Sequence, residues 1–479
     1  MTPFMSNLSS IGPEVVLTLT ALALLVGGAI RGERAGGLIN MISIVVLVGA
    51  AILGLKSAGA ETTQAFGGAL IFDKLALFAK TAILLSAALV LMIGAGFLKI
   101  EKIVKYEYSI LILLATIGMM IMVSANDLLS LYVGLELQSL ALYVLAAFNR
   151  NSLRASEAGL KYFVLGALSS GLLLYGMSMV YGFAGTTRFA GIAEAANADA
   201  SVGLVIGIVF VLSGLAFKIS AVPFHMWTPD VYQGAPTPVT AFFASAPKLA
   251  AITLIARLLL GPFADMMDQW QQVLVALSVL SMTVGYFGAI MQRNIKRLMA
   301  YSSIANMGYA MIALAAGSER GMEALLLYMG LYLITTLGMF ACILAMRQSE
   351  GMVENIDDLA GLSQNRRGLA ISFSILLFSI SGLPPMAGFF GKLYIFLAAV
   401  DGGLLWLAIY GAVLSVVGAF YYLRLVKIMW FDDPAPSFVP SGFVLTLTAG
   451  TAAFFMLPGA LWLLPALARW AGAAAGSLF

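Results

Sequence analysis

Three lysines lie inside apolar stretches that are long enough to cross a lipid bilayer. Each stands close to a proline. The lysines are Lys218, Lys248 and Lys392, and the prolines are Pro223, Pro247, Pro384 and Pro385. A charge at the depth of the hydrocarbon costs at least a few kcal/mol, so such residues usually face a polar interior and mark a path for ions or protons. This arrangement predicts a transport protein.

One acidic residue, Glu136, lies near the middle of an apolar segment. It follows Asp127 by nine residues, which at about 1.5 Å per helical residue places it roughly 13 Å into a hydrocarbon layer about 30 Å thick. Gln138 and Ser139 are its polar neighbours. Either the carboxyl is protonated and holds helices together, or it ionises against a lysine of another helix. An unpaired acid is costly at this depth, which favours the second interpretation.

Two further basic residues within apolar segments have simpler interpretations. Lys161 follows Glu157 by four residues, so either the two form an ion pair at the membrane edge or the lysine reaches inward. Arg257 lies near one membrane interface, where extension of the side chain toward the headgroups is the favoured interpretation.

The first predicted helix break follows Lys218. Pro223 has no amide hydrogen and clashes with the carbonyl four residues before it, that of Ile219, so the helix should end beside the lysine. Irregular backbone at this depth is tolerated only where protein or water covers it. His225 follows the break. With an unperturbed pKa of about 6.5 it is either a proton relay between Lys218 and Lys248 or a structural residue.

Two other proline sites predict interruptions. Pro247 directly precedes Lys248, and the pair Pro384 and Pro385 divides a long apolar stretch in which Lys392 comes after the prolines. Interrupted apolar segments in both halves of a membrane protein indicate a transporter with internal repeats.

The composition of the 479-residue chain places it in a membrane. Hydrophobic residues make up 61% and charged residues only 10%, against about 25% charged residues in soluble domains. The chain has one cysteine and one histidine, which excludes a multi-cysteine iron–sulfur cluster and bis-histidine haem ligation. The net charge of +3 is diffuse, unlike a nucleic-acid-binding patch. We therefore expect one integral membrane domain with no redox centre, metal or cofactor, and no nucleic-acid partner.

The apolar windows predict an all-α fold of about fourteen transmembrane helices. Spans four to eight and nine to thirteen would form two inverted five-helix repeats, each with a broken helix. The predicted spans are 13–30, 38–55, 73–98, 107–123, 127–147, 157–182, 203–222, 238–260, 269–291, 298–316, 322–346, 369–400, 403–430 and 442–466. Within the single domain, residues 1–479, the parts are 1–106 for three N-terminal spans, 107–260 and 269–430 for the repeats, and 442–466 for the last span.

The loops on one side of these spans hold three times as many basic residues as those on the other. The richer side has Arg31, Arg34, Lys99, Lys102, Lys105, Arg150, Arg154, Arg293, Lys296, Arg297, Arg347, Arg366, Arg367, Arg424 and Lys427; the other has Lys56, Lys74, Arg188, Arg320 and Arg469. Cytoplasmic loops carry the excess of Lys and Arg, so we expect both termini on the periplasmic side.

Four segments together resemble a known family. They are Glu136 in its span, Lys218 with VPFHMWTPDVYQGAPTP at 222–238, PKLA at 247–250, and SGLPPMAGFFGKLY at 381–394. They resemble the antiporter-like membrane subunits of the proton-pumping NADH:quinone oxidoreductase, respiratory complex I, which are related to multisubunit cation/proton antiporters. The resemblance covers essentially the whole chain. The lysine at 392 and the absence of a long lateral helix after the last span favour the subunit N branch over the L and M branches.

The resemblance implies proton translocation, as part of an enzyme, in the bacterial inner membrane. Glu136 and Lys218 would form the charged pair of one half, Lys161 and Lys248 would continue the path with His225 nearby, and Lys392 would be the terminal site toward the outside. Other membrane-arm subunits and lipids would be the partners. FMN, iron–sulfur clusters and quinone would belong to partner subunits, whose redox chemistry drives the transfer.

Two alternatives stay open at this point. A secondary cation/proton antiporter would need an oxygen-rich cation site beside the lysines. A non-pumping structural membrane subunit would keep its charges for assembly.

Overall fold

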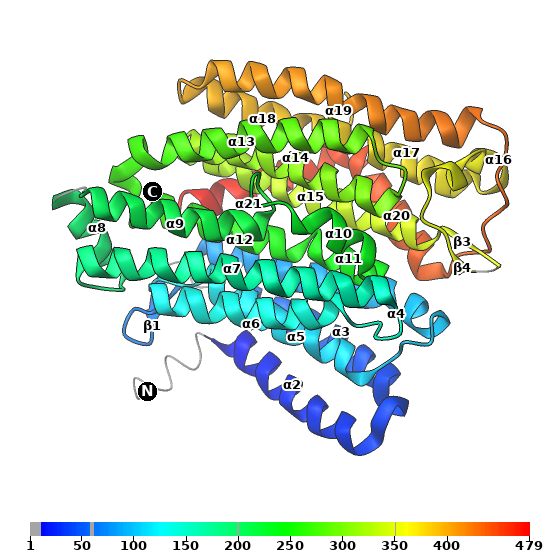
Figure 1. Cartoon of the computed structure of the whole chain (residues 1–479), viewed down its shortest axis with the longest axis horizontal. Helices are drawn as coiled ribbons and strands as arrows, with labels where there is room; N and C mark the ends of the chain where they lie inside the picture. The colour runs from blue at the N-terminus through cyan, green and yellow to red at the C-terminus, as the bar shows by residue number, and fades with distance from the viewer. Residues whose placement is uncertain (1–10, 58–61, 199–200, 350) are drawn as a thin grey trace.

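The computed structural model describes residues 11–57, 62–198, 201–349 and 351–479, which form α-helices and two very short strand pairs (Figure 1). The expected all-α class is confirmed. A helix satisfies its own backbone hydrogen bonds, which is what an apolar segment needs where lipid offers no partner.

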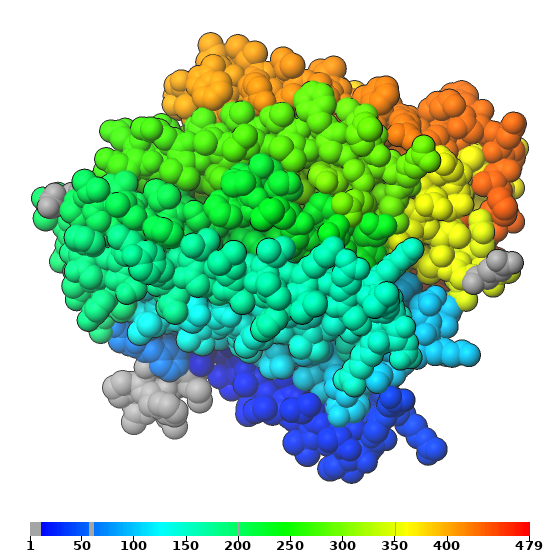
Figure 2. Space-filling model, viewed as in Figure 1, coloured from blue at the N-terminus to red at the C-terminus, as the bar shows by residue number. Residues whose placement is uncertain are grey.

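The N-terminal part is a helical hairpin followed by a longer helix. Its elements are α2 (Gly12–Arg31), α3 (Gly36–Ser57), β1 (Thr63–Ala65), β2 (Leu70–Phe72) and α4 (Lys74–Ile100). The turn Gly32–Ala35 lets α2 and α3 fold back and pack against each other. Asp73 caps α4, because its carboxylate accepts a hydrogen bond from the amide of Ala76 at 2.7 Å. The helix α2, dark blue, stands out at one edge of the molecule (Figure 2).

The middle of the chain encloses its most buried helices. The elements are α5 (Tyr106–Val123), α6 (Leu128–Ala146), α7 (Leu153–Ala184), α8 (Phe189–Ala198), α9 (Val202–Ile219), α10 (Trp227–Gly234), α11 (Thr237–Phe243) and α12 (Ala246–Leu260). Glycines let α5 and α6 approach closely: a Cβ on Gly118 would lie 2.5 Å from the amide nitrogen of Gln138. Every residue of α11 and α12 is buried.

The remaining helices surround a second buried pair. The elements are α13 (Met267–Ile290), α14 (Ile295–Ala315), α15 (Glu319–Leu344), β3 (Arg347–Gln348), β4 (Gly351–Met352), α16 (Leu362–Asn365), α17 (Arg367–Ser381), α18 (Ala387–Asp401), α19 (Leu405–Phe431), α20 (Phe443–Met456) and α21 (Ala460–Ala475). The helices α14 and α15 are almost wholly buried, whereas α19 exposes much of its apolar surface along the edge opposite to α2 (Figure 1).

The helix breaks explain why the number of spans depends on how they are counted. Among the described residues, 11 helices are long and apolar enough to cross a membrane, or up to 12 if the pair α20 and α21, bent by 80°, counts as one. The hairpin α2 and α3 counts once as a run of 45 residues, although it folds back. The halves α17 and α18 have 15 residues each, shorter than a span. Fourteen spans and the inverted repeats stay predictions.

Candidate functional site: buried amines at interrupted helices

Lys248 meets the backbone carbonyl that the first helix break leaves free. The helix α9 ends at Ile219, and Pro223, four residues on, has no N–H to offer the Ile219 carbonyl. The Lys248 Nζ instead donates to this carbonyl at 2.8 Å and to Ser220 Oγ at 2.6 Å. Lys248 is 1% exposed. The amine therefore occupies a buried position at the C-terminal, negative end of α9, where a cation is stabilised by the helix dipole.

The position of Pro247 within its helix differs from the expectation. The interruption before Lys248 falls at Ala244 and Ser245, and Pro247 lies in the first turn of α12. A proline suits that position because the first amides of a helix have no partner within it. Pro247 thus begins a helix whose third residue is the buried Lys248.

Lys218 lies on α9 just before the same break and points toward α6. Its Nζ donates to Ser139 Oγ at 2.7 Å and lies 3.4 Å from Tyr143 Oη, and the residue is 6% exposed. The carboxylate of Glu136, also on α6, accepts a hydrogen bond from Ser170 Oγ at 2.5 Å. Among the described residues, no ion pair within 4 Å joins Glu136 to Lys218. The expected charged pair is therefore not a direct contact here. The Lys218 ammonium donates instead to Ser139, which lies one helical turn beyond Glu136.

Lys392 occupies a second site of the same kind. The helix α17 ends at Ser381, Gly382 adopts a left-handed conformation with φ +85°, and Pro384 and Pro385 fill the gap before α18. The Lys392 Nζ donates to the Ser381 carbonyl at 3.0 Å and to Ser415 Oγ at 2.9 Å.

The environment of Lys392 is enclosed. The residue is 3% exposed, and its Nζ lies 4.7 Å from the centre of the Tyr309 ring. Gly382 makes room for the chain, since a Cβ there would lie 2.9 Å from Lys392 Cδ. Both breaks therefore offer an amine one helix-terminal carbonyl and one serine hydroxyl.

Lys161 lies outside this buried interior. Its Nζ forms ion pairs with Glu157 at 2.7 Å and with Asp230 at 2.8 Å, and its side chain is 40% exposed. The other carboxylate oxygen of Asp230 accepts from Arg297 at 2.6 Å. Of the two interpretations of Lys161, the structure shows the i, i+4 ion pair with Glu157. Sequence spacing did not indicate the additional ion pair with Asp230.

Asp230 joins three helices at this point. It lies on the short helix α10, while Lys161 is on α7 and Arg297 is on α14. Burial alone would raise the pKa of Asp230, but the hydrogen bonds and charges of Lys161 and Arg297 hold the pKa below its ordinary value. Ion pairs therefore join α10, the short helix after the first break, to α7 on one side and to α14 on the other.

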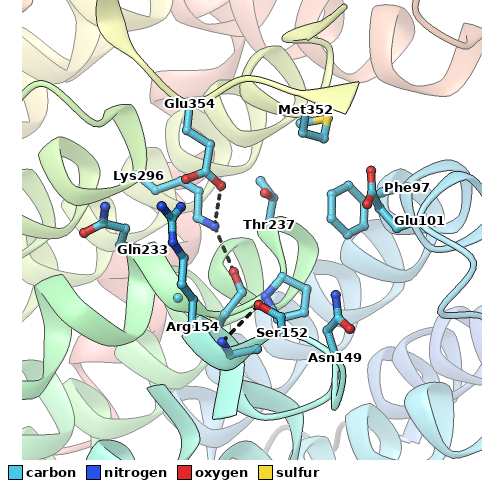
Figure 3. A pocket seen from close by; sticks show the side chains of 14 residues that line it. Phe97, Glu101, Asn149, Ser152, Arg154, Gln233, Thr237, Lys296, Met352 and Glu354 are labelled. Atoms are coloured by element: carbon cyan, nitrogen blue, oxygen red, sulfur yellow. Dashed lines mark hydrogen bonds and ion pairs between the residues drawn. The ribbon is translucent and has the colours of Figure 1, made fainter. Parts of the chain in front are cut away.

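The ion pair of Lys296 and Glu354 lines a neighbouring cavity of about 180 Å³ (Figure 3). Lys296 Nζ donates to Glu354 at 2.9 Å and to the carbonyl of Ala235 at 2.8 Å. Burial opposes ionisation of Glu354, but the charge of Lys296 and hydrogen bonds from Lys296 and Asn294 lower its pKa. Arg154 and Ser152 line the same cavity. The C-terminal end of α4, the loops after α6 and α10, the first turn of α14 and the segment from β4 to Glu354 meet here.

His225 lies in the interruption between α9 and α10. Its ring is partly buried, and its Nδ1 has no hydrogen-bond partner among the described residues. No hydrogen bond joins it to Lys218 or Lys248 in the part of the chain that the structure describes. Its role as a relay stays a prediction.

A group of buried hydroxyl and amide side chains lies in the region between Lys248 and Lys392, and sequence reasoning missed it. Tyr328 Oη donates to Asn306 at 2.6 Å, Asn306 donates to the Ser302 carbonyl at 2.8 Å, and Ser302 Oγ lies 2.5 Å from Tyr422 Oη. The helix α14, which carries Ser302, Asn306 and Tyr309, packs against both α10 and α18. The available signal was polar residues at helical spacing inside an apolar span.

Two buried ion pairs near the opposite end of the bundle were also not foreseen. Arg257 forms a two-point pair with Asp73, at 2.7 and 2.8 Å, and donates to the Val123 carbonyl at 3.0 Å. The expectation that Arg257 extends toward the headgroups is wrong, because its side chain is only 4% exposed. Lys80 and Glu14 form the other pair at 2.6 Å. Groups of three or more His, Cys, Asp or Glu residues arranged to hold a metal ion are absent from the described residues.

Comparisons with known proteins agree with one another. A family model described as "NADH:quinone oxidoreductase/Mrp antiporter, TM" matches residues 125–418. NADH-quinone oxidoreductase subunit N of Maricaulis maris is 56% identical over 461 residues, covering 95% of this chain and 96% of that protein. The corresponding subunit of Rhodospirillum rubrum is 55% identical over 455 residues, covering 93% of each.

Solved structures give the same result for the fold. A chain of respiratory complex I from Thermus thermophilus aligns with a TM-score of 0.81 at 31% identity, covering 95% of this chain and 99% of that one. A chain of the Mrp complex from Dietzia sp. aligns with a TM-score of 0.87 at 21% identity, covering 100% and 98%. The second likeness is one of fold alone.

Proposed function

Because the chain belongs to the subunit N family of NADH-quinone oxidoreductase, an antiporter-like family of multi-pass bacterial membrane subunits, we propose that it moves protons across the membrane. The proton path would use Glu136, Lys218, Lys248 and Lys392. Redox chemistry in partner subunits would drive it, with FMN, iron–sulfur clusters and quinone bound there and none in this chain. Neighbouring membrane-arm subunits would be its direct partners, and both termini would lie on the periplasmic side.

The observation that carries this proposal is the pairing of buried amines with hydroxyl groups at two helix breaks. Lys248 and Lys392 each contact one carbonyl and one serine hydroxyl, and no carboxylate among the described residues lies within 4 Å of either amine. A hydroxyl both donates and accepts. It accepts from the charged ammonium, and after deprotonation it can turn to donate to the neutral amine. Each site therefore suits both protonation states.

The energies required are modest. Moving one charge through about 100 mV costs about 2.3 kcal/mol, and one pKa unit corresponds to about 1.4 kcal/mol. A change of charge near Glu136 that alters the proton affinity of Lys218 by two or three pKa units in each cycle would suffice. Transfer from Lys218 through Lys248 to Lys392 would then need water to join the hydroxyl groups on α14 and its neighbours.

The test replaces each amine in the assembled complex. Lys248→Ala and Lys392→Ala should abolish proton pumping in membrane vesicles while the complex remains assembled. Lys248→Met and Lys392→Met, which keep side-chain volume, cover the case in which alanine prevents folding. Lys56→Ala, which removes an exposed lysine, is the matched control.

Three outcomes would contradict the proposal. Unchanged pumping in all four variants would leave a structural role. Loss of assembly in the methionine variants as well would make the amines packing elements. Sodium-dependent flux through the isolated chain would favour a secondary cation/proton antiporter.

A further inference from the structure

A cavity of about 590 Å³ opens on the lateral surface between α5, α6 and α7. Val144 and Phe163 line it and are themselves 54% and 50% exposed, so the cavity faces whatever surrounds the protein in the membrane. None of the four residues of the proposed proton path lines it, but Tyr143, which lies beside Lys218, forms part of its wall.

The lining of this groove changes from charged to apolar along the direction of the helices. Lys105 precedes α5, and Leu111 lies six residues further, about 9 Å deeper at 1.5 Å per residue. Arg150 lies in the loop between α6 and α7, and Phe163 lies about 15 Å along α7 from its start at Leu153. The charged mouth is therefore at the membrane surface, and the apolar part lies at hydrocarbon depth.

The mouth of the groove carries both positively and negatively charged side chains. The guanidinium of Arg150 forms no hydrogen bond or ion pair with the described residues. The Lys105 ammonium has only a 3.7 Å contact with the exposed Glu33, and such a contact contributes little in water. Glu107 also lines the groove, and its carboxylate has no ion pair or hydrogen bond with the described residues. A carboxylate without a partner in such a groove calls for a donor.

We propose that this groove binds a phospholipid with an ethanolamine headgroup. The lipid phosphate lies between Lys105 and Arg150, the headgroup ammonium donates to Glu107, and one acyl chain runs past Leu111, Val144 and Phe163. A simple anionic lipid would satisfy the two cations and leave Glu107 facing a phosphate. A transmembrane helix of a neighbouring subunit would have to place a zwitterion at the mouth to match the same three charges.

The lipid site adjoins the proposed proton path. Tyr143 lines the groove, and its Oη lies 3.4 Å from the Nζ of Lys218. An acyl chain in the groove therefore packs against a side chain that helps to hold the buried amine. This inference goes beyond the transport function and stands without it.

The first test measures lipid retention by the assembled complex after detergent washing, with native mass spectrometry as the readout. The double variant Lys105→Ala/Arg150→Ala should lose one tightly held phosphatidylethanolamine. Each cation near the surface contributes about 1 kcal/mol, so the loss of two weakens retention about thirty-fold. The control Lys99→Ala/Arg34→Ala removes the same charge from exposed positions outside the groove and should retain the lipid.

Two more variants make the inference specific. Glu107→Gln should abolish the preference for phosphatidylethanolamine over phosphatidylglycerol, and Val144→Trp should fill the apolar part and displace the lipid with all three charges intact. Equal retention in the wild type and all these variants would overturn the proposal. So would a photo-reactive phosphatidylethanolamine that labels no residue of α5, α6 or α7, or a cross-linker at residue 163 that captures a neighbouring subunit instead.

Discussion

At the scale of single residues, the proposed proton transfer depends on amines that donate to backbone carbonyls. Lys248 and Lys392 each bind the last carbonyl of a helix that a proline has interrupted. The sequence could indicate this for Ile219, because a proline four residues on removes the expected donor. It could not indicate which lysine would reach that carbonyl, because Lys248 is on another helix and Lys218, the nearer one in sequence, turns toward Ser139.

Glu136→Gln tests the charge of the acidic residue separately from its hydrogen bond. The glutamine carbonyl can still accept from Ser170, so the fold should be kept while the charge is lost. We expect proton pumping in vesicles to fall at least about tenfold, the equivalent of one pKa unit of lost coupling. Glu33→Gln, at an exposed turn, should pump normally. Wild-type pumping by Glu136→Gln would show that the charge is not used.

Gly382→Ala tests the positioning of Lys392. The new methyl group would lie 2.9 Å from Lys392 Cδ, and the left-handed backbone at φ +85° adds strain of about 1–2 kcal/mol. Gly403→Ala is a matched control, because Gly403 has φ +75° but an added Cβ would meet nothing within 4 Å. Both variants should lower the unfolding temperature similarly, and only Gly382→Ala should lower pumping. Equal pumping in the two would remove the positioning argument.

At the scale of elements, ion pairs hold the short helix α10, which follows the first helix break, against its neighbours. Spacing predicted the pair of Lys161 with Glu157, four residues apart on one helix, and that pair is present. Spacing did not predict Asp230, which lies 69 residues from Lys161 and 67 from Arg297. Contacts between helices depend on how the helices pack, and that information is not local in sequence.

Asp230→Asn should loosen α10. It removes two ion pairs at once, so α10 loses its ionic links to α7 and α14 and keeps its packing and the hydrogen bond from Arg297 to Gln233. We expect amide hydrogen exchange across residues 227–234 to accelerate by about tenfold, while exchange in α12 stays unchanged. Asp268→Asn, in the first turn of α13, serves as the control. Unaltered exchange in α10 would mean that apolar packing alone holds it.

The same carboxylate gives a pH dependence with a defined sign. The pKa of Asp230 is lowered from 3.8 in the folded protein, so its stabilisation is complete above that value and is lost as the pH falls through the lower folded value. Protection of α10, corrected for intrinsic exchange rates, should therefore be constant near neutrality and decrease only in the acid range. Asp230→Asn should lack this transition. A transition near neutral pH in the wild type would contradict the assignment.

At the scale of the whole molecule, the sequence predicted the membrane class and most helices, because long apolar runs determine both. The predicted spans 73–98 and 107–123 correspond to α4 and α5, for example. The bend after Met456 was not predicted, although Pro458 and Gly459 mark it in the sequence. The buried pair of Arg257 and Asp73 was not predicted either. The position of a residue in the sequence shows that it lies near a membrane interface, but not whether its side chain faces lipid or protein.

Arg257→Ala should destabilise the assembly of α12 with α4. It leaves Asp73 buried without its cation, and breaking such a pair costs about 3–5 kcal/mol. We expect a lower unfolding temperature and less assembled complex. Arg257→Leu combined with Asp73→Asn should recover part of the loss, because the asparagine can still cap α4. A double variant no more stable than Arg257→Ala would show that the guanidinium acts through its bond to Val123 instead.

The polar side chains on α14 and its neighbours have one more consequence. Tyr328, Asn306, Ser302 and Tyr422 form a run without a formal charge, and its hydroxyl groups can reverse their hydrogen bonds. The amide of Asn306 cannot pass a proton on, so conduction along this run would need water beside it, and hydroxyl groups that can turn either way would give the transfer no preferred direction. One-way motion would have to be imposed at its two ends, by whatever opens and closes access to Lys248 and Lys392 in turn.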